Sequence, residues 1–192
     1  MFEPFDHQRV TAEFLSINHR AFCFNEAGTG KTSSVLWAAD YLMNLGKIKK
    51  VLIICPLSIM YSVWQGDVFN TCMHRTSQVC HGSADKRKKI IQGDWDFTII
   101  NYDGVGIVKE DIMSAGYDLI VVDECNAYKT HTTARWKALF KILGGKEKNE
   151  DMKLWMMTGT PASQSPMDAF GLAKLVCPDN VPRLSAAWKE KT

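Results

Sequence analysis

The sequence lacks the features that mark exported or membrane-spanning chains. No window approaches 18 uninterrupted apolar residues, so no membrane-spanning helix is predicted. The first ten residues, MFEPFDHQRV, contain acidic residues and lack the basic and apolar regions of a signal peptide. The six cysteines include no C-x-x-C pair, and we expect them to be reduced thiols of a cytoplasmic protein with no membrane partner.

A strong charge of either sign is also missing. The formal net charge is +2 over 192 residues, so a nucleic-acid partner would need a local basic patch rather than a global excess. The basic runs at 47–50 and 85–89 are predicted to be solvated faces. With 46% hydrophobic residues and no internal repeat, the chain is long enough for one substantial core and too short for two ordinary domains. We therefore expect a single unit over 1–192.

Short apolar runs rich in β-formers alternate with longer amphipathic ones. Strands are predicted at 20–24, 50–56, 77–81, 97–102, 117–123 and 153–159. Helices are predicted at 6–18, 31–45, 58–70, 83–92, 104–114, 133–143 and 166–176. Because several strands are almost wholly apolar, both faces of their sheet must be covered. The pattern predicts a three-layer α/β domain with a mostly parallel central sheet, whose ligands bind at the carboxyl ends of the strands.

A cluster of cysteine and histidine side chains raises the question of zinc. Its members are Cys72, His74, Cys80 and His81. Their spacing matches no common zinc motif, and adjacent residues of a strand point to opposite faces. The sequence therefore disfavours a zinc site.

The segment NEAGTGKT at 25–32 is a candidate phosphate loop. Gly28 and Gly30 lie between a predicted strand and a predicted helix, so consecutive backbone N–H groups can meet an anion at the positive end of the helix. Lys31 would reach the β and γ phosphates of ATP, and the Thr32 hydroxyl would ligate Mg²⁺. A plain strand-to-helix turn is the alternative reading.

The match is to the A-G-T-G-K-T variant of this motif, because the strict pattern needs glycine where the chain has Asn25. The predicted nucleotide-binding residues of the loop are Ala27, Gly28, Thr29, Gly30, Lys31 and Thr32.

Two adjacent acids, Asp123 and Glu124, end the most hydrophobic predicted strand. In a phosphate-loop enzyme the first acid holds Mg²⁺ through water, and the second polarises the water that attacks the γ phosphate. We therefore predict Asp123 as a metal residue, and Glu124 with Lys31 as the catalytic residues. A strand-end turn with solvated acids is the alternative for this pair alone.

With AGTGKT, DECN at 123–126 and MMTGTP at 156–161 in that order, the chain resembles the first RecA-like lobe of superfamily two helicases. The resemblance implies a P-loop NTPase fold with ATP and Mg²⁺ as cofactors. FDHQ at 5–8 is similar to the Q motif, which implies that the amide of Gln8 reads adenine. TGTP implies that Thr158 and Thr160 relay the nucleotide state between lobes.

Three further segments resemble the Swi/Snf-type branch, the duplex-DNA translocases. CPLSIMYSVW is similar to its P-x-S-x-x-x-x-W pattern at Pro56, Ser58 and Trp64, with five residues rather than four between the serine and the tryptophan. TIINYDGV resembles its next DNA-side motif, and SPMDAFGLAKLVCP resembles the helix after TGTP. The resemblance implies DNA contacts at Pro56, Ser58 and Tyr102. Trp64 itself is read as core packing, because it occupies an apolar position at helical spacing.

The main departure from the family is Asn126, where the branch has histidine. Asparagine can donate and accept a hydrogen bond but carries no charge. We expect ATP chemistry to be retained and its coupling, through Asn126, to be altered.

The resemblance also implies a partner lobe. Family members need a second lobe that supplies arginine fingers, and we expect it to be absent from this chain. An arginine finger is worth about 10³–10⁵ in rate, so this lobe alone should bind ATP weakly and be nearly inactive.

We therefore interpret the chain as the ATP-binding lobe of a DNA-dependent ATPase that moves along duplex DNA without sequence preference. The alternatives are a lobe of a restriction-type translocase or RNA helicase, and a nucleotide-gated binding module that does not hydrolyse ATP. A small-molecule kinase is the weakest alternative, because it needs no TGTP motif. The compact lobe suggests a bacterial or phage protein.

Overall fold

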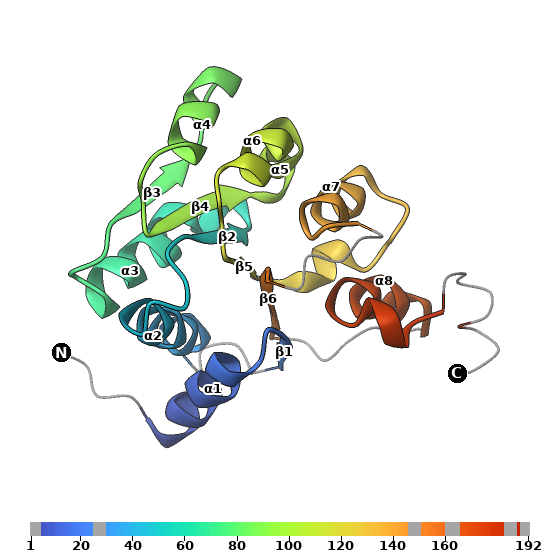
Figure 1. The fold of residues 1–192 in the computed structure, drawn as a ribbon, viewed down its shortest axis with the longest axis horizontal. Coiled ribbons are helices and arrows are strands. Elements are labelled where there is room, and N and C mark those ends of the chain that lie inside the picture. Colours follow the sequence, from blue (N-terminus) through green and yellow to red (C-terminus); the bar gives the residue numbers. More distant parts are fainter. Residues whose placement is uncertain (1–4, 25–29, 146–150, 160–165, 183–187, 189–192) are drawn as a thin grey trace.

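The computed structural model describes residues 5–24, 30–145, 151–159, 166–182 and 188. Six parallel strands form one sheet in the order β1-β6-β5-β2-β4-β3 (Figure 1). The strands are β1 Arg20–Phe24, β2 Val51–Cys55, β3 Ser77–Cys80, β4 Phe97–Asn101, β5 Leu119–Val122 and β6 Lys153–Thr158. The predicted α/β class and parallel sheet are confirmed, and every described strand pair is parallel.

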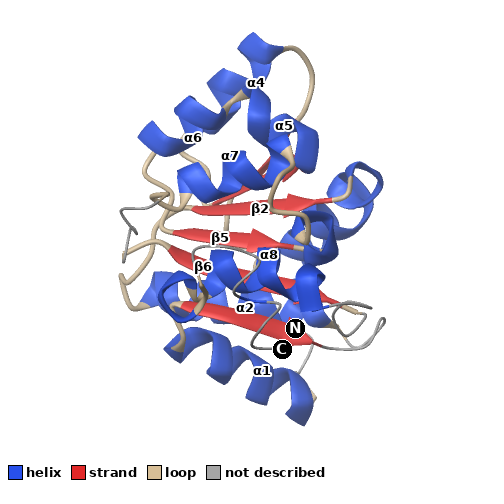
Figure 2. Ribbon diagram, turned by 90° about the vertical axis from the view of Figure 1, so that its right-hand side faces the viewer, coloured by secondary structure: helices blue, strands red, loops and turns tan. Residues whose placement is uncertain are grey.

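Helices cover both faces of the sheet, which makes three layers (Figure 2). The α-helices are α1 Asp6–Ile17, α2 Lys31–Asn44, α3 Gly66–Thr71, α4 Ala84–Ile91, α5 Tyr102–Ile107, α6 Lys109–Ser114, α7 Ala134–Ile142 and α8 Pro166–Val176. Shorter helical segments are η1 Leu57–Ile59, the π-helix η2 Met60–Gln65, η3 Cys125–Tyr128 and η4 Pro178–Asn180. None of the helices in the described part of the chain is both long and apolar enough to cross a bilayer.

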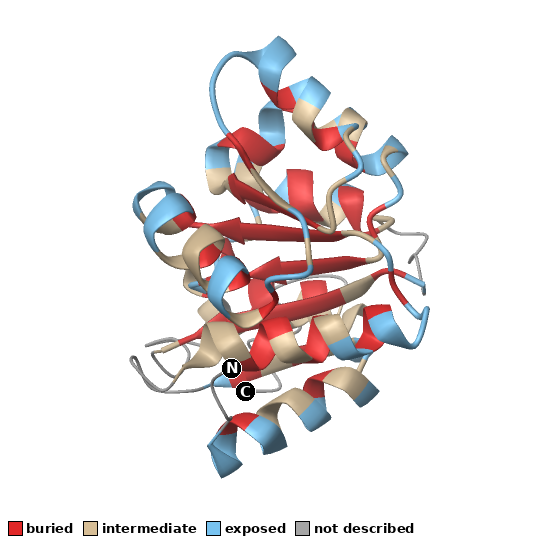
Figure 3. Ribbon diagram, turned by 90° about the vertical axis from the view of Figure 1, so that its left-hand side faces the viewer, coloured by how far each residue is buried: buried red, intermediate tan, exposed pale blue. Residues whose placement is uncertain are grey.

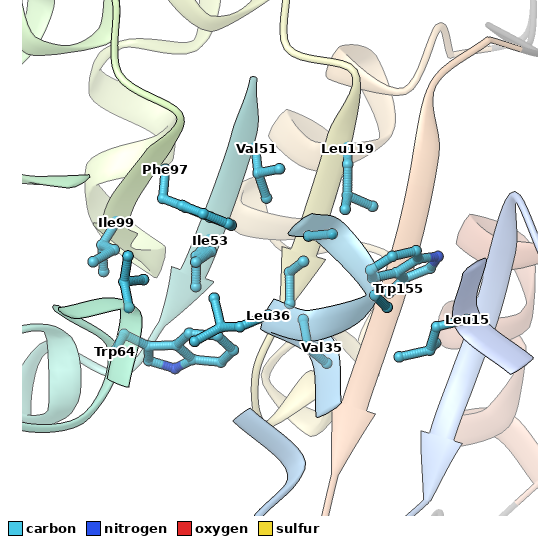
Figure 4. Close-up of a cluster of buried hydrophobic side chains, with 14 of the residues drawn as sticks. Leu15, Val35, Leu36, Val51, Ile53, Trp64, Phe97, Ile99, Leu119 and Trp155 are labelled. Carbon is cyan, nitrogen blue, oxygen red and sulfur yellow. The ribbon is translucent and has the colours of Figure 1, made fainter. Parts of the chain in front are cut away.

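Strand β2 shows why the sheet has two cores. All five of its residues are buried, as expected for a central parallel strand. Val51 and Ile53 point to one face, where α1, α2, η2 and α3 pack, whereas Leu52 and Ile54 point to the face covered by α4 to α8. Figure 3 shows the resulting buried sheet between helices whose outer faces are exposed, and Figure 4 shows the first of the two clusters.

Two predicted helices are interrupted in the structure. The helix expected at 58–70 begins as a 3₁₀ turn, continues as the π-helix η2 and ends as α3. The helix expected at 104–114 is divided into α5 and α6 at Val108, whose backbone (φ −114°, ψ 26°) leaves the helical region. Val108 is only 1% exposed, so the junction between the two helices lies in the core.

The prediction of a solvated basic run at 47–50 is wrong for Lys50. Its ammonium donates to the backbone oxygens of Gly93 (3.0 Å) and Ala115 (3.1 Å) and lies 4.7 Å from the ring centre of Tyr117. Burial lowers the pKa of this lysine, and two nearby carboxylates oppose the change. Lys50 therefore connects the loops that contain Gly93 and Ala115, at the amino ends of the strands.

The cysteine and histidine side chains that raised the question of zinc lie in different surroundings. Cys72 and Cys80 are fully buried. His74 is engaged elsewhere, 2.8 Å from an oxygen of Asp40. Among the described residues, no group of three or more metal-binding side chains comes together.

Candidate nucleotide-binding and catalytic site

The predicted motifs converge at the carboxyl edge of the sheet. In the strand register Phe24, the last residue of β1, pairs with Thr158 of β6. Val122, which ends β5, pairs with Met156 of β6 and Ile54 of β2. The ends of four adjacent strands therefore lie side by side, and each is followed by a motif that the sequence analysis singled out.

Gly30 ends the candidate phosphate loop and begins α2. Its φ of +71° is left-handed, a conformation that glycine adopts without steric cost. A Cβ atom here would also collide with the side-chain amide nitrogen of Gln8. Gln8 is 7% exposed, and its Oε1 accepts the backbone N–H of Phe5 at 2.9 Å. The structure thus brings Gln8 against Gly30, while Ala27, Gly28 and Thr29 lie outside the described residues.

Lys31 and Thr32 occupy the first turn of α2 and are partly buried. That turn contains no acidic residue, so the positive end of the helix dipole is left for a ligand. Burial raises the pKa of the Cys125 thiol to about 12 and Glu124 adds to the rise, whereas the Lys31 ammonium opposes it. Burial likewise raises the pKa of Cys23, and again Lys31 opposes the rise. The charge of Lys31 therefore lies close to the ends of both β1 and β5.

The acid pair forms a sharp turn directly after β5. Asp123 is 8% exposed, and its Oδ1 accepts the backbone N–H of Glu124 at 2.9 Å. Its Oδ2 accepts the indole N–H of Trp64 at 3.0 Å. Glu124 has φ 51° and ψ 59°, an uncommon left-handed conformation for a glutamate. Such backbone strain concentrates at functional sites, and here it turns an exposed acid away from the buried strand.

Tyr102 supports the same turn from its other side. Its hydroxyl donates to the backbone oxygen of Asp123 at 2.6 Å. Burial, followed by the negative charge of Asp123, raises the pKa of Tyr102, so the hydroxyl remains a donor at neutral pH. The guanidinium carbon of Arg135 lies 4.9 Å from the centre of the Tyr102 ring, and Arg135 also pairs with Asp103 at 2.9 Å. Tyr102, predicted to contact DNA, is thus joined directly to the acid turn.

Two of the predicted coupling residues, Asn126 and Thr158, contact each other. The side-chain amide of Asn126 donates to the hydroxyl of Thr158 at 3.3 Å, which links the acid turn to the end of β6. The Asn126 side chain, although uncharged, therefore reaches the end of β6 and hydrogen-bonds there. Thr160 lies outside the described residues.

The other predicted DNA residues lie after β2. Pro56 is half-buried at the strand end, and Ser58 is exposed in η1. Neighbouring Leu57 and Tyr61 are also exposed, at 54% and 56%. This surface adjoins the acid turn, because β2 lies next to β5.

Sequence reasoning missed the roles of two residues. Trp64 is core packing as predicted, but it also holds Asp123. Arg87, predicted to be solvated, is only 7% exposed and donates to the backbone oxygen of Cys80 (3.0 Å) and to Oδ1 of Asn101 (3.1 Å). The family pattern that ends in tryptophan was a signal for Trp64, whereas nothing in the basic run distinguished Arg87 from its exposed neighbours.

Comparison with known proteins supports the same assignment. The model of the SNF2-related domain matches residues 7–192. A Caenorhabditis elegans homolog of the SWI/SNF-related regulator of chromatin subfamily A containing DEAD/H box 1 is 24% identical, over 89% of this chain and 18% of its own length. The ATP-dependent helicase YqhH of Bacillus subtilis is 22% identical, over 94% of this chain and 30% of its own length. The chain thus spans less than a third of either relative.

Among solved structures, the Sulfolobus solfataricus SWI2/SNF2 ATPase core in complex with dsDNA superimposes with a TM-score of 0.78 at 20% identity. The match covers 93% of this chain and 38% of that one, and it shows a shared fold. With its parallel sheet, its converging motifs and a family match over 7–192, the chain belongs to the SNF2-related domain family as a Swi/Snf-type ATPase lobe.

Proposed function

We propose that this lobe binds Mg²⁺-ATP at the carboxyl edge of the sheet and, together with a second lobe, hydrolyses it to ADP and phosphate to move along duplex DNA. The observation that carries the proposal is the convergence of Lys31, Glu124 and Thr158 from three distant parts of the chain. Their strands, β1, β5 and β6, are neighbours with β6 in the centre. Placing a motif at each of three adjacent strand ends makes a ligand site in an open parallel sheet.

The side chains at this edge fit a magnesium nucleotide. Lys31 offers a flexible positive charge at the amino end of a helix, which suits phosphate oxygens. The Thr32 hydroxyl and the Asp123 carboxylate are oxygen donors of the kind that Mg²⁺ prefers, directly or through water. Bound Mg²⁺ would neutralise charge that develops on the phosphates. Gln8 packs against Gly30, and we propose that its amide meets the base of the nucleotide.

Glu124 is the proposed residue that polarises the attacking water. Its left-handed backbone turns it out of the strand, and the charge of Lys31 acts on its neighbour Cys125. A carboxylate in this position can accept a proton from water as the bond to the γ phosphate breaks. The second lobe would supply the arginine that stabilises the transition state.

Duplex DNA is the proposed partner on the β2 and β4 side of the same edge. Pro56 and Ser58 follow β2, and Tyr102 follows β4. The solved Sulfolobus solfataricus relative was captured with dsDNA, which supports this choice. Contacts to the phosphate backbone would be independent of sequence and weakened by salt.

The first test is ATP binding by Lys31→Ala. The variant should lose about 2–3 kcal/mol of binding free energy, since a charged hydrogen bond to phosphate is removed. Isothermal titration with Mg²⁺-ATP measures this loss. Lys137→Ala, an exposed lysine of α7, is the matched control and should bind as the unchanged chain does. Equal affinities for both variants would reject the phosphate-loop assignment.

The second test measures steady-state ATP hydrolysis with and without nucleic acid. A protein that joins this lobe to its second lobe should be stimulated by duplex DNA and not by RNA. Stimulation by RNA alone would favour the RNA-helicase alternative. Tight ATP binding without turnover in the two-lobe protein would favour a nucleotide-gated binding module.

A further inference from the structure

Trp64 connects the segment after β2 to the acid turn. Its side chain is fully buried within the first core cluster, the cluster that also contains Leu36 and Ile53 (Figure 4). At the rim of that cluster its indole N–H donates to Oδ2 of Asp123 at 3.0 Å, across 59 positions of sequence. The bond therefore fastens a rigid, packed ring to a candidate metal residue.

Other buried tryptophans in this lobe donate to neutral acceptors. The indole of Trp155 donates to the backbone oxygen of Asn18 at 3.1 Å, and that of Trp136 donates to the backbone oxygen of Gly171 at 2.8 Å. Of these three bonds, the one from Trp64 alone has a carboxylate acceptor. A hydrogen bond to a charged group is the stronger and more directional kind.

The carboxylate of Asp123 is held at both oxygens. Oδ2 accepts from Trp64, and Oδ1 accepts the backbone N–H of Glu124 at 2.9 Å. Each carboxylate oxygen has two lone pairs, so one on each remains for a metal ion or its water. Rotation of the carboxylate would break both hydrogen bonds. These two donors therefore fix the orientation of the carboxylate before any ligand binds.

The local backbone around Trp64 is unusual. Residues Met60–Gln65 form a π-helix, a rare conformation that is found frequently at functional sites. The wider turn changes the angular position of the residues that follow, and both Met60 and Trp64 end up fully buried. The exposed Ser58 lies in η1, directly before this π-helix, so residues 58–64 connect a candidate DNA surface to the acid turn.

We propose that Trp64 is a positioning residue that fixes the Asp123 carboxylate in the orientation needed to bind magnesium nucleotide. The proposal rests on the proposed function, since it assigns Trp64 a role in that same site. Outer partners of metal-binding groups commonly contribute a factor of 10–100 in metal affinity. A tryptophan that served packing alone would affect stability without changing the metal dependence of nucleotide binding.

The test compares Trp64→Phe with Trp155→Phe. Both changes remove a buried indole N–H and keep an aromatic ring. Titration calorimetry on the folded 192-residue chain would measure ATP affinity with Mg²⁺ and with EDTA, and the ratio gives the gain due to the metal. We expect Trp64→Phe to reduce this gain about 10-fold, with the EDTA affinity unchanged. Trp155→Phe should keep the full gain.

Equal gains in the two variants would overturn the role of Trp64. Failure of the proposed function has a different signature, because then the unchanged chain would show no gain from Mg²⁺ at all.

A measurement on the unchanged chain covers the case in which Trp64→Phe does not fold. In a ¹⁵N-tryptophan-labelled sample, each indole N–H gives one NMR signal, and contacts with methyl groups of Leu36 and Ile53 identify that of Trp64. Adding Mg²⁺ to the ATP-bound chain should shift the Trp64 signal and leave those of Trp155 and Trp136 in place. A Trp64 signal that stays fixed while the backbone signal of Gly30 shifts would overturn the proposal.

Discussion

Strand β5 has an aspartate at each end, and the two carboxylates have opposite surroundings. Asp118, just before the strand, accepts the backbone N–H groups of Lys49 (2.6 Å) and Lys50 (3.0 Å) on a single oxygen. Its own backbone N–H and oxygen bond to Lys50 and Lys153 on the two neighbouring strand starts. Asp123, just after the strand, is held by Trp64 and by the next backbone N–H. Asp118 therefore joins three chain segments, whereas the side chain of Asp123 is held in one orientation at the candidate site.

The lysines at the two edges differ in the same way. Lys50 at the amino edge donates its ammonium to backbone oxygens within the protein. Lys31 at the carboxyl edge lies at the start of a helix whose positive end has no acidic neighbour. The difference follows from the parallel sheet, because its carboxyl edge gathers helix amino ends and strand-end side chains, which makes it the edge for ligands.

The largest expected effect is on ATP turnover and concerns the carboxyl edge of the sheet. Glu124→Gln should lower ATP turnover by about 10²–10⁴-fold, because a general base contributes about that much. ATP affinity should be unchanged. Steady-state phosphate release by the protein with both lobes measures the loss. The surface glutamate change Glu110→Gln is the control, and turnover at the parent rate in Glu124→Gln would exclude Glu124 as the base.

At the opposite edge, Asp118→Ala should lower the free energy of unfolding by about 1.5–3 kcal/mol. The reason is that the change leaves two backbone N–H groups without their charged acceptor. Urea unfolding followed by circular dichroism measures the loss. Nucleotide affinity should be unchanged, and a variant with parent stability but weaker ATP binding would reverse our assignment of the two edges.

The matching change after the strand, Asp123→Asn, should show the inverse pattern. The amide oxygen can still accept the indole N–H of Trp64, whereas the amide NH₂ group replaces the oxygen that accepts the backbone N–H of Glu124. Because one hydrogen bond is lost, we expect the free energy of unfolding to fall by about 0.5–1.5 kcal/mol, less than in Asp118→Ala. The affinity gained from Mg²⁺ should fall about 10–100-fold. Calorimetric titration of ATP with Mg²⁺ and with EDTA provides the measurement. A full Mg²⁺ gain in this variant would show that the carboxylate does not serve the metal.

The smallest expected effect is the loss of stability when either of two tyrosines, Tyr102 or Tyr117, is changed to phenylalanine. Tyr102→Phe removes the bond to the acid turn, and Tyr117→Phe removes a bond to Thr98 (2.9 Å) near the amino edge. Each should lower the free energy of unfolding by about 0.5–1.5 kcal/mol. Only Tyr102→Phe should also slow turnover in the two-lobe protein. Equal turnover in the two variants would mean that the Tyr102 bond has a structural role alone.

Most of the fold was predictable because the signals are local. Buried parallel strands are continuous apolar runs, and all six predicted strands are found within one or two residues of their expected ends. Strand order could not be predicted, since β1 pairs with β6, more than a hundred residues away. The π-helix was also missed, because its apolar spacing resembles that of an ordinary helix.

The candidate site was predictable to the extent that it consists of contiguous motifs. Gln8, Gly30 and Lys31 are brought to one edge with Asp123 and Glu124. Their roles in ATP binding and hydrolysis, like the cytoplasmic location, stay predictions. Ala27, Gly28, Thr29 and Thr160 lie outside the described residues.

By itself, the sequence determined the elements and the chemistry at their ends, because apolar runs, a glycine-rich turn and an acid pair are properties of neighbouring residues. Only the tertiary structure decided which polar groups serve the fold and which serve the site. Arg87 is buried among neutral oxygens, and Trp64 donates its indole N–H to the carboxylate of Asp123. Both outcomes depend on hydrogen-bond partners that packing supplies from other elements, and neither partner is recorded in the local pattern of the chain.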